Sequence, residues 1–380
     1  MLGKHYGIVD SLFASNSSGG EMKKNFLLVV FALLLFILSC GKKPTEVELK
    51  QYVWNFSTPE AQGMNAQILD SAFIQAELAG FIDGLLVIRN GYIIAEKYYN
   101  GYSEVVPHNI MSVSKSYLSA LTGIALHKGY LHSLDEKVLD YFPEYIYPGM
   151  DKEKYDITIR HLLTMRMGIE NETENYFEIY NSDNWIKTTI ELPLIFNPGE
   201  RMCYNTFQTH LLSAIISKTS KMSTMRFACT FLTSRMGITI DYWEQDPQGY
   251  YFGGNSMYFI PREMATLGYL YLNGGRLNDL QIVPREWVEF TLTPSTSLRP
   301  NEWGAFKNYN YAYLWWLGQI NNYDLFMAYG YGGQFVVNFP NLNLIVVSTA
   351  NNQVDWDTST IQEWAIFDII SRYILPAIIN

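Results

Sequence analysis

β-forming residues gather at both ends of the chain, and this distribution constrains the fold more than any other feature of the sequence. Two β-rich runs within 85–96 flank Asn90-Gly91, a pair that favours the two positive φ angles of a type I′ hairpin turn. A second hairpin is predicted over 335–349, with its turn at Pro340-Asn341. Because hairpins bury apolar surface only against further elements, we expect the N- and C-terminal segments to meet in one antiparallel sheet.

The middle of the chain shows helical periodicity instead. Helices are predicted at 117–125, 159–165, 209–216 and 361–373. The last of these is expected to pack on the sheet through Ile361, Trp364, Ala365, Ile369 and Tyr373. Segments 250–255 and 292–313 are rich in Gly, Pro, Asn and aromatic residues, and we expect them to be irregular. The predicted fold class is therefore α/β (α+β), with helices flanking the sheet, an inserted and mostly helical lobe at about 113–255, and a cleft where the two join.

An export signal is predicted near the N-terminus. Lys23 and Lys24 precede an unbroken apolar run of thirteen residues at 26–38, which is too short to cross a bilayer but suits the core of a secretory signal. The run ends in Ile37-Leu38-Ser39-Cys40, which resembles a bacterial lipobox. This resemblance implies that Cys40 becomes the lipidated first residue of the mature protein. An ordinary signal or a membrane anchor is the alternative.

These features divide the chain into three parts. Residues 1–40 are interpreted as the signal segment, with Met22 as a second candidate start, 41–60 as a polar tether, and 61–380 as the folded domain. We expect an exported protein of the cell envelope or periplasm, attached to the membrane through Cys40.

Composition and missing motifs exclude several classes of function. The net charge of −10 comes with no basic stripe that could neutralise phosphates, so no nucleic-acid partner is expected. The six histidines include no His-x-x-x-His pair beside an acid, and neither a metal nor another cofactor is predicted. A Gly-x-Ser-x-Gly motif is also missing. Cys203 and Cys229 are too few for a disulfide framework and are expected to be buried and unpaired.

The first candidate for chemistry is Ser112-Val113-Ser114-Lys115, at the start of a predicted helix. Three residues make nearly one helical turn, so the Ser112 hydroxyl and the Lys115 amine share one face. The Ser112 N–H, at a helix N-terminus, is free to point at an oxyanion. A lysine held away from water has a lowered pKa and can accept the serine proton. Ser-x-x-Lys alone is weak evidence, because about one or two are expected by chance in a chain of this size.

Several segments from about Gly84 onward strengthen this interpretation, because their order is typical of one superfamily. They are the hairpin around Asn90-Gly91, then 111–116, 157–164, 197–201, 251–254, 261–265 and 332–334. With them the chain resembles the serine β-lactamase and D-alanyl-D-alanine peptidase superfamily, in the class C-like branch that includes penicillin-binding esterases and 6-aminohexanoate-dimer hydrolases. The resemblance implies a β-lactamase/transpeptidase-like fold, with Ser112 as the nucleophile and Lys115 as a proton-transfer partner.

The second motif of this superfamily is Tyr-x-Asn, whose Tyr assists proton transfer to and from the serine. Tyr204-Asn205-Thr206 stands at the matching place, and the resemblance implies that Tyr204 has this catalytic role. Thr206 replaces the Asn as the expected substrate-binding residue. Its hydroxyl cannot offer the donor and acceptor of an amide together, which weakens the expected contact with a substrate amide.

Ser182-Asp183-Asn184 competes for the same role, because it spells the Ser-Asp-Asn motif of class A enzymes. Its neighbours Tyr180, Asn181 and Trp185 are typical of a polar loop that turns into a helix, where Ser and Asp also act as caps. We favour the capping interpretation.

The third motif, Lys-Thr-Gly or His-x-Gly in the superfamily, is degenerate in this chain. Counting back from 332–334 places it at Ala328-Tyr329-Gly330. The resemblance implies that Gly330 lets the backbone approach the substrate, and that the Tyr331 N–H joins the Ser112 N–H in the oxyanion hole. The Lys of the superfamily helps to bind carboxylates, so Ala328 predicts weaker binding of penicillins and of peptide C-termini.

Together these residues predict a serine hydrolase that acts through an acyl-enzyme on an ester, a small amide or a peptide-like small molecule. Aromatic residues within 309–316 could line an acyl pocket, although sheet packing is the favoured interpretation. Two alternatives stay open: a D-alanyl-D-alanine peptidase or β-lactamase, and a non-catalytic cell-envelope binding protein with the same fold. The departures at Thr206 and Ala328 leave room for the second.

Overall fold

The computed structural model describes residues 52–294 and 301–379. The predicted signal segment, the Cys40 lipidation site and the first part of the predicted tether lie outside these residues. Within the described part of the chain, no helix is both long enough and apolar enough to span a membrane.

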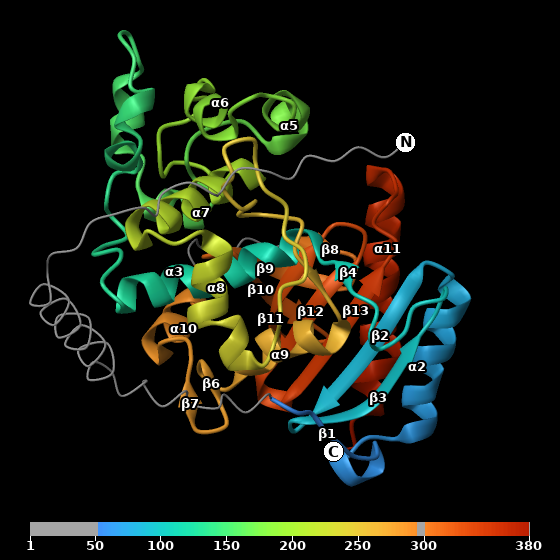
Figure 1. The fold of residues 1–380 in the computed structure, drawn as a ribbon. Helices are drawn as coiled ribbons and strands as arrows, with labels where there is room; N and C mark the ends of the chain where they lie inside the picture. The colour runs from blue at the N-terminus through green and yellow to red at the C-terminus, as the bar shows by residue number, and fades with distance from the viewer. Residues whose placement is uncertain (1–51, 295–300, 380) are drawn as a thin grey trace, which may run out of the picture. The chain divides into compact units, whose positions relative to one another are not determined.

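A nine-stranded sheet forms the centre of the described fold (Figure 1). Its strand order is β1-β3-β2-β13-β12-β11-β10-β9-β8, and all neighbours are antiparallel except β1, which is parallel to β3. The strands are β1 (Asn55–Phe56), β2 (Ile82–Arg89), β3 (Tyr92–Tyr98), β8 (Glu302–Trp303), β9 (Phe306–Ala312), β10 (Trp315–Ile320), β11 (Tyr323–Gly330), β12 (Gln334–Phe339) and β13 (Leu344–Ala350). Because β13 pairs with β2, the N- and C-terminal segments meet in the sheet as predicted.

Both predicted hairpins are confirmed. Asn90 and Gly91 have φ angles of 53° and 82°, the two positive values that a type I′ turn requires between β2 and β3. The turn between β12 and β13 is a short 3-10 helix at Pro340–Leu342, followed by Asn343 with a φ of 44°.

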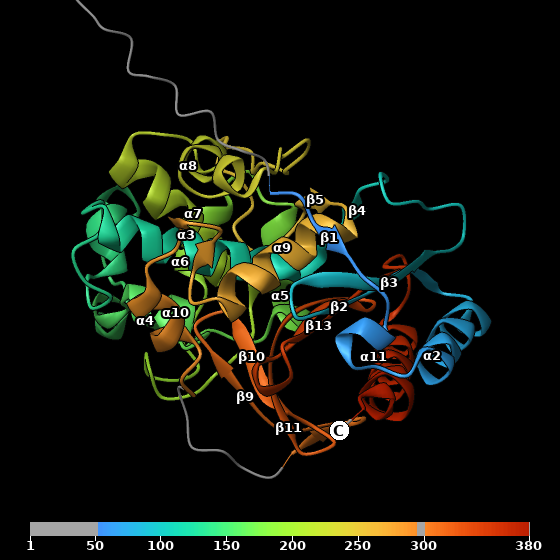
Figure 2. The ribbon, with the colours of Figure 1, turned by 90° about the horizontal axis from the view of Figure 1, so that it is seen from below.

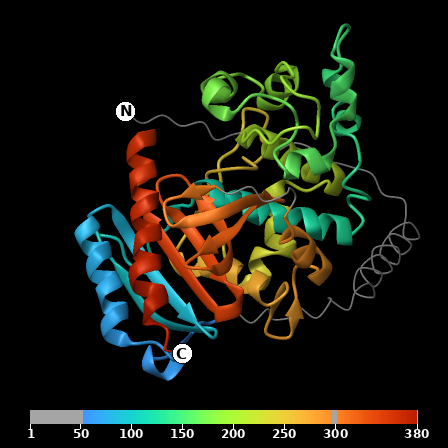
Figure 3. The same cartoon turned by 180° about the vertical axis from the view of Figure 1, so that it is seen from behind.

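Helices pack on both faces of the sheet (Figures 1 and 2). On one face α2 (Ala66–Ala79) and α11 (Trp356–Ile369) lie side by side, which Figure 3 shows most clearly, and they share an apolar core with the sheet. The opposite face packs against α3 (Ser114–His127) and α9 (Pro261–Leu272). The two faces therefore have separate cores, and the second core is continuous with the helical region.

The helical region lies between two short strands, β4 (His108–Asn109) and β5 (Tyr258–Phe259), which pair with each other. It contains α3 and then α4 (Ile159–Leu163), α5 (Glu172–Tyr180), α6 (Trp185–Glu191), α7 (Thr206–Ser220) and α8 (Thr224–Phe231). Beyond it come α9, the short hairpin of β6 (Arg276–Leu277) and β7 (Leu280–Gln281), and α10 (Arg285–Thr291). The residues of α3 from Ser114 to Ala125 are all buried, because this helix lies between the sheet and the other helices. The described chain is the mixed α and β fold that the sequence predicted.

Two predicted irregular segments are wrong in part. The tether was expected to extend to residue 60, but the chain joins the sheet at Asn55, and the Trp54 indole is buried against Tyr269 and donates a hydrogen bond to the Arg262 carbonyl. The segment 292–313 was expected to be irregular, but it contains β8 and the whole of β9.

The terminal helix α11 forms as predicted, but it presents a different face to the sheet. Ile361 and Trp364 are exposed, and the buried side instead includes Gln362 and Glu363. Burial of these polar side chains is compensated by hydrogen bonds, since the Gln362 amide donates to the Gly332 and Asn351 carbonyls at 2.7 and 2.8 Å. The polar side of α11 thus holds the turn that follows β11.

Candidate active site

Ser112 lies in a single 3-10 turn, Met111–Val113, immediately before α3. The turn is fixed from several sides, because the Ser114 hydroxyl donates to the Met111 carbonyl at 2.7 Å and the Met111 N–H donates to the Asn109 side chain at 3.0 Å. Met111 has a φ of 50°, an unfavourable angle for a residue with a side chain. Local strain of this kind persists only where the surroundings determine the backbone, and it sets the position of the Ser112 hydroxyl.

The Lys115 amine is the nearest base to that hydroxyl. Its Nζ lies 2.7 Å from Ser112 Oγ, 2.9 Å from Thr206 Oγ1 and 2.8 Å from the Gly254 carbonyl oxygen. The side chain is only 1% exposed, and burial lowers the pKa of Lys115 to about 7, although the negative charge of Glu172 opposes the shift. Near neutral pH a large fraction of the amine is therefore uncharged and has a lone pair available for the serine proton.

Tyr204 completes the group that the sequence predicted. Its side chain lines the same cavity as Ser112, and its ring centroid lies 4.9 Å from Lys115 Nζ. Burial, and then the negative charge of Glu172, hold the pKa of Tyr204 well above its ordinary value, while the nearby Ser112 hydroxyl acts in the opposite sense. The phenol therefore keeps its proton at neutral pH, and Lys115 is the better proton acceptor of the two.

Thr206 lies behind the lysine rather than in front of it. The side chain is 1% exposed and its hydroxyl contacts Lys115, whereas its place in the motif predicted a contact with substrate. Thr206 is the first residue of α7, and its N–H donates to Glu172 Oε2 at 2.7 Å. The structure thus links Thr206 to the base rather than to a substrate amide.

The carbonyl of Gly254 reaches Lys115 because its loop packs directly on α7. A Cβ added to Gly253 would lie 2.3 Å from the Thr209 carbonyl oxygen, and one added to Gly254 would lie 2.4 Å from Thr209 Oγ1. Only glycine permits this approach. The pair Gly253-Gly254 therefore has a clear structural role in the site.

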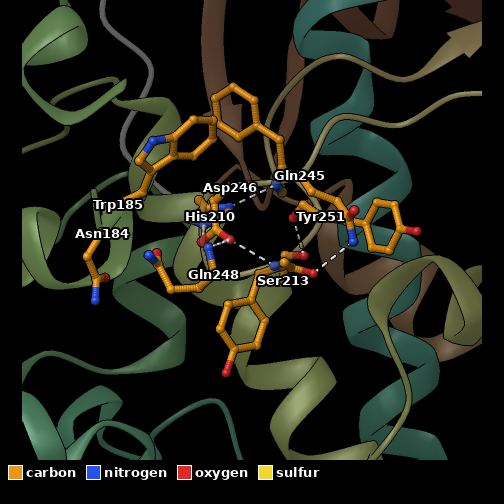
Figure 4. A network of polar contacts seen from close by, with 12 residues as sticks. Asn184, Trp185, His210, Ser213, Gln245, Asp246, Gln248 and Tyr251 are labelled. Carbon is orange, nitrogen blue, oxygen red and sulfur yellow. Dashed lines mark hydrogen bonds and ion pairs between the residues drawn. The ribbon is translucent and has the colours of Figure 1, made fainter. Parts of the chain in front are cut away.

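A buried His–Asp pair supports the same loop (Figure 4). His210 Nε2 lies 2.8 Å from Asp246 Oδ2, and both side chains are fully buried. The second oxygen of Asp246 accepts the Gln248 and Tyr250 N–H groups, and His210 Nδ1 accepts the Gly253 N–H at 3.4 Å. This network links α7 to the loop that presents the Gly254 carbonyl.

The end of β11 closes the site on the other side of Ser112. A Cβ on Gly330 would lie 2.4 Å from the Ile110 carbonyl oxygen and 3.0 Å from Met111 Cβ, so the strand meets the serine turn at van der Waals distance. Tyr331 follows directly and lines the same cavity as Ser112. The Ala328 side chain is buried in the core beside α3. The structure therefore places Gly330 and Tyr331 next to Ser112. Ala328, at the position where the superfamily has a Lys or His, adds no charge to the site.

A cavity of about 230 Å³ opens beside Ser112, Tyr204 and Tyr331. Its other lining residues come from distant parts of the chain: Glu172, Trp303, Trp316, Tyr329, Trp356, Thr360 and Glu363. Of the aromatic residues within 309–316, Trp316 lines the cavity whereas Trp315 is fully buried in the core, because neighbouring residues of a strand face opposite ways. Sequence reasoning missed Glu172 and Glu363, since neither belongs to a local motif.

The competing motif Ser182-Asp183-Asn184 lies in the loop between α5 and α6, and it is not among the residues that line this cavity. The Asn184 side chain accepts the Lys187 N–H at 2.9 Å and caps α6, while the Ser182 hydroxyl donates to the Ile179 carbonyl. The motif therefore caps a helix as predicted, although the capping residue is Asn184 rather than Ser182 or Asp183. Both cysteines of the described chain are free, with Cys203 buried and Cys229 partly exposed. Residues 52–294 and 301–379 contain no cluster of three or more His, Cys, Asp or Glu side chains suited to a metal ion.

The site groups a serine, a buried lysine and a tyrosine between an antiparallel sheet and a helical region. This arrangement is typical of one class of serine hydrolase. Residues 74–369 match the model of the beta-lactamase family. The chain belongs to the beta-lactamase family.

A curated relative and solved structures are similar to this chain. A 6-aminohexanoate-dimer hydrolase of Paenarthrobacter ureafaciens is 22% identical over 263 residues, which cover 62% of this chain and 64% of the relative. The match thus spans less than two thirds of that relative's own length. The structure of EstCE1, a hydrolase with promiscuous acyltransferase activity, has a TM-score of 0.66 at 15% identity and covers 82% of this chain and 100% of that one. A penicillin-binding protein from Bacillus halodurans has a TM-score of 0.60 at 16% identity, covering 79% and 99%. At these identities the structures show a shared fold.

Proposed function

We propose that this protein is a serine hydrolase that forms an acyl-enzyme on Ser112 and cleaves an ester or a small amide. One observation carries the proposal: the Ser112 hydroxyl lies 2.7 Å from a buried amine whose pKa is lowered to about 7. A pure binding protein has no need of a base matched to neutral pH beside a serine, whereas nucleophilic catalysis requires one.

Acylation begins when Ser112 Oγ attacks the substrate carbonyl carbon and its proton passes to Lys115 Nζ. The negative oxygen of the tetrahedral intermediate lies against the N–H groups of Ser112 and Tyr331. The bond to the alcohol or amine leaving group then breaks, and that group takes a proton from Lys115 through the Tyr204 hydroxyl. Water attacks the acyl carbonyl in the second step and gives its proton to the same amine. The bond between the acyl carbon and Ser112 Oγ then breaks, Oγ takes that proton from Lys115, and the carboxylic acid leaves.

The substrate class follows from what the cavity offers. No Lys, Arg or His side chain is among its described lining residues, and Ala328 replaces the cation that binds carboxylates in this superfamily. β-Lactams and peptides that end in a carboxylate are therefore expected to be poor substrates. The relative named for an aminohexanoate dimer and the promiscuous acyltransferase EstCE1 support amide and ester acyl groups as the range to search.

The test is an intact-mass and activity measurement on residues 45–380. We expect p-nitrophenyl butyrate to be hydrolysed, a fluorophosphonate to add one label, and peptide mapping to find that label on Ser112. Ser112→Ala should abolish both, whereas Ser182→Ala, in the competing motif, should retain them. Turnover by folded Ser112→Ala would overturn the assignment of the nucleophile. A folded wild-type protein that neither turns over esters, amides and nitrocefin nor acquires a label would favour the non-catalytic binding protein.

We also propose that the protein is exported and anchored to a membrane through Cys40. The apolar run that ends in a lipobox-like sequence supports this proposal.

A further inference from the structure

The described residues that line the cavity beside Ser112 include acidic side chains but no basic ones. Glu172 and Glu363 contribute to its wall, and the described lining residues include no basic side chain. The Lys115 amine contacts the Ser112 hydroxyl and is buried, and it is not among the described lining residues. A substrate group that enters the cavity therefore meets negative potential.

The two glutamates are held firmly but differently. Glu172 is half-buried at the start of α5, and its Oε2 accepts the Thr206 N–H at 2.7 Å. Glu363 is 3% exposed, and its Oε1 accepts the Tyr329 and Ser359 hydroxyls, each at 2.8 Å. Burial raises the pKa of Glu363 to about 7, against the effect of these hydrogen bonds, so a fraction is ionised at neutral pH. Glu172 is thus the more accessible carboxylate, and Glu363 reinforces it.

The rest of the wall is aromatic. Trp303 packs edge-on to Tyr329 at 4.8 Å between ring centroids, and Trp316 lies 6.2 Å from the same tyrosine and 6.3 Å from Tyr204. Trp356 lies 5.9 Å from Tyr331 and is 61% exposed, so it forms the outer rim. Aromatic faces attract a cation through their quadrupoles, and several of them around one cavity form the kind of site that binds quaternary ammonium groups.

From these observations we propose that the acyl group of the substrate carries a cationic amine or quaternary ammonium, which lies in the aromatic and acidic cavity beside Ser112. This inference rests on the proposed function, because it names the acyl group that Ser112 accepts. The cavity volume of about 230 Å³ accommodates a short chain with a trimethylammonium end.

Charge in the cavity also acts on the base. Glu172 opposes the lowering of the Lys115 pKa, so a cation that neutralises Glu172 favours the uncharged amine. A carboxylate in the same place favours the charged amine, which cannot accept the Ser112 proton. Discrimination by charge is therefore expected in kcat as well as in KM.

The test compares three p-nitrophenyl esters of similar size: 4-(trimethylammonio)butanoate, its uncharged carbon isostere 5,5-dimethylhexanoate, and the hemiester of glutarate. We expect kcat/KM for the cationic ester to exceed that of the uncharged isostere about tenfold or more, as cation–π and ionic contacts in a partly desolvated site allow. The anionic ester should be the poorest. Because the first two share one shape, their ratio isolates the effect of charge.

Two variants test which residues produce the preference for the cationic ester. Glu172→Gln keeps an oxygen for the Thr206 N–H but removes the charge, and Trp356→Leu removes one aromatic face; each should bring the cationic-to-neutral ratio towards one. Glu174→Gln changes an exposed glutamate on the same helix and should leave the ratio unchanged. A ratio of one or below in the wild-type protein, with turnover that still depends on Ser112, would overturn the cation inference alone. Turnover independent of Ser112 would instead overturn the proposed function.

Discussion

The Lys115 amine and the Thr206 hydroxyl lie 2.9 Å apart, and both side chains are buried. In the superfamily that this chain resembles, an Asn occupies the position of Thr206. Because Lys115 also contacts the Gly254 carbonyl and Ser112 Oγ, a single hydroxyl at 206 is enough to complete its surroundings. The replacement therefore preserves the base and alters only what the Asn would have offered to a substrate.

We predict that Thr206→Val lowers kcat about tenfold and that Thr206→Ser retains most activity. Valine removes one acceptor of the lysine N–H groups, and hydrogen bonds to charged groups contribute about 1.5–3 kcal/mol. Its loss destabilises the charged amine, so the pKa that limits activity at low pH should move lower while the amine becomes less well oriented. Steady-state kinetics at several pH values measure both effects. Unchanged kinetics for Thr206→Val would show that the contact has no part in catalysis.

The pH dependence of the wild-type enzyme gives a second prediction. The uncharged form of Lys115 is the active one, and its pKa is about 7 because the side chain is buried. As pH falls below this value, kcat/KM should fall tenfold per unit, and above it a plateau is expected. Lys115→Arg cannot lose its proton and should reduce kcat by about 100-fold or more at every pH. A flat profile from pH 5 to 8 would contradict the assignment of the base.

Local chemistry explains which parts of the fold were predictable. The turn at Asn90-Gly91 requires two positive φ angles, and its residues favour them strongly. The turn between β9 and β10 also contains two positive φ angles, 46° at Tyr313 and 74° at Leu314. Neither Tyr nor Leu favours such an angle, so the residue types do not indicate this turn. The neighbouring strands also contain a register shift between Leu317 and Gln319. This part of the sheet therefore escaped prediction.

The candidate site also has a part that the sequence predicted and a part that it did not. Ser112 and Lys115 are one helical turn apart, so their proximity follows from spacing alone, and Tyr204 was found through a motif. Glu172 and Glu363 lie far apart in the sequence, and only the fold brings them to the wall of one cavity. The buried face of α11 was mistaken because Glu363 is satisfied by hydrogen bonds that no apolar pattern reveals.

The proposed lipid anchor gives a third prediction. In cells that express the full chain, Cys40→Ala should abolish incorporation of labelled palmitate and move the protein from the membrane fraction to the soluble fraction. Lipid transfer requires that thiol, so Cys203→Ala and Cys229→Ala, at the two free cysteines of the folded domain, are the matched controls and should incorporate label normally. Undiminished labelling of Cys40→Ala would contradict the anchor without affecting the catalytic proposal.

The buried pair His210 and Asp246 gives the last prediction, because it supports the loop that presents the Gly254 carbonyl to Lys115. Asp246→Ala leaves the His210 ring N–H without its acceptor, at a cost of about 1–3 kcal/mol for that buried donor alone, and also removes the acceptor of two loop N–H groups. We expect a lower midpoint in urea denaturation.

A loosened loop should also misplace the carbonyl at Lys115, so kcat of the still-folded protein should fall more than KM changes. Asp156→Ala is the control, since it removes an equally close but exposed contact with Lys137 and should leave both measurements nearly unchanged. Lower stability with wild-type kcat would assign His210 and Asp246 to the core and remove them from the positioning of the base.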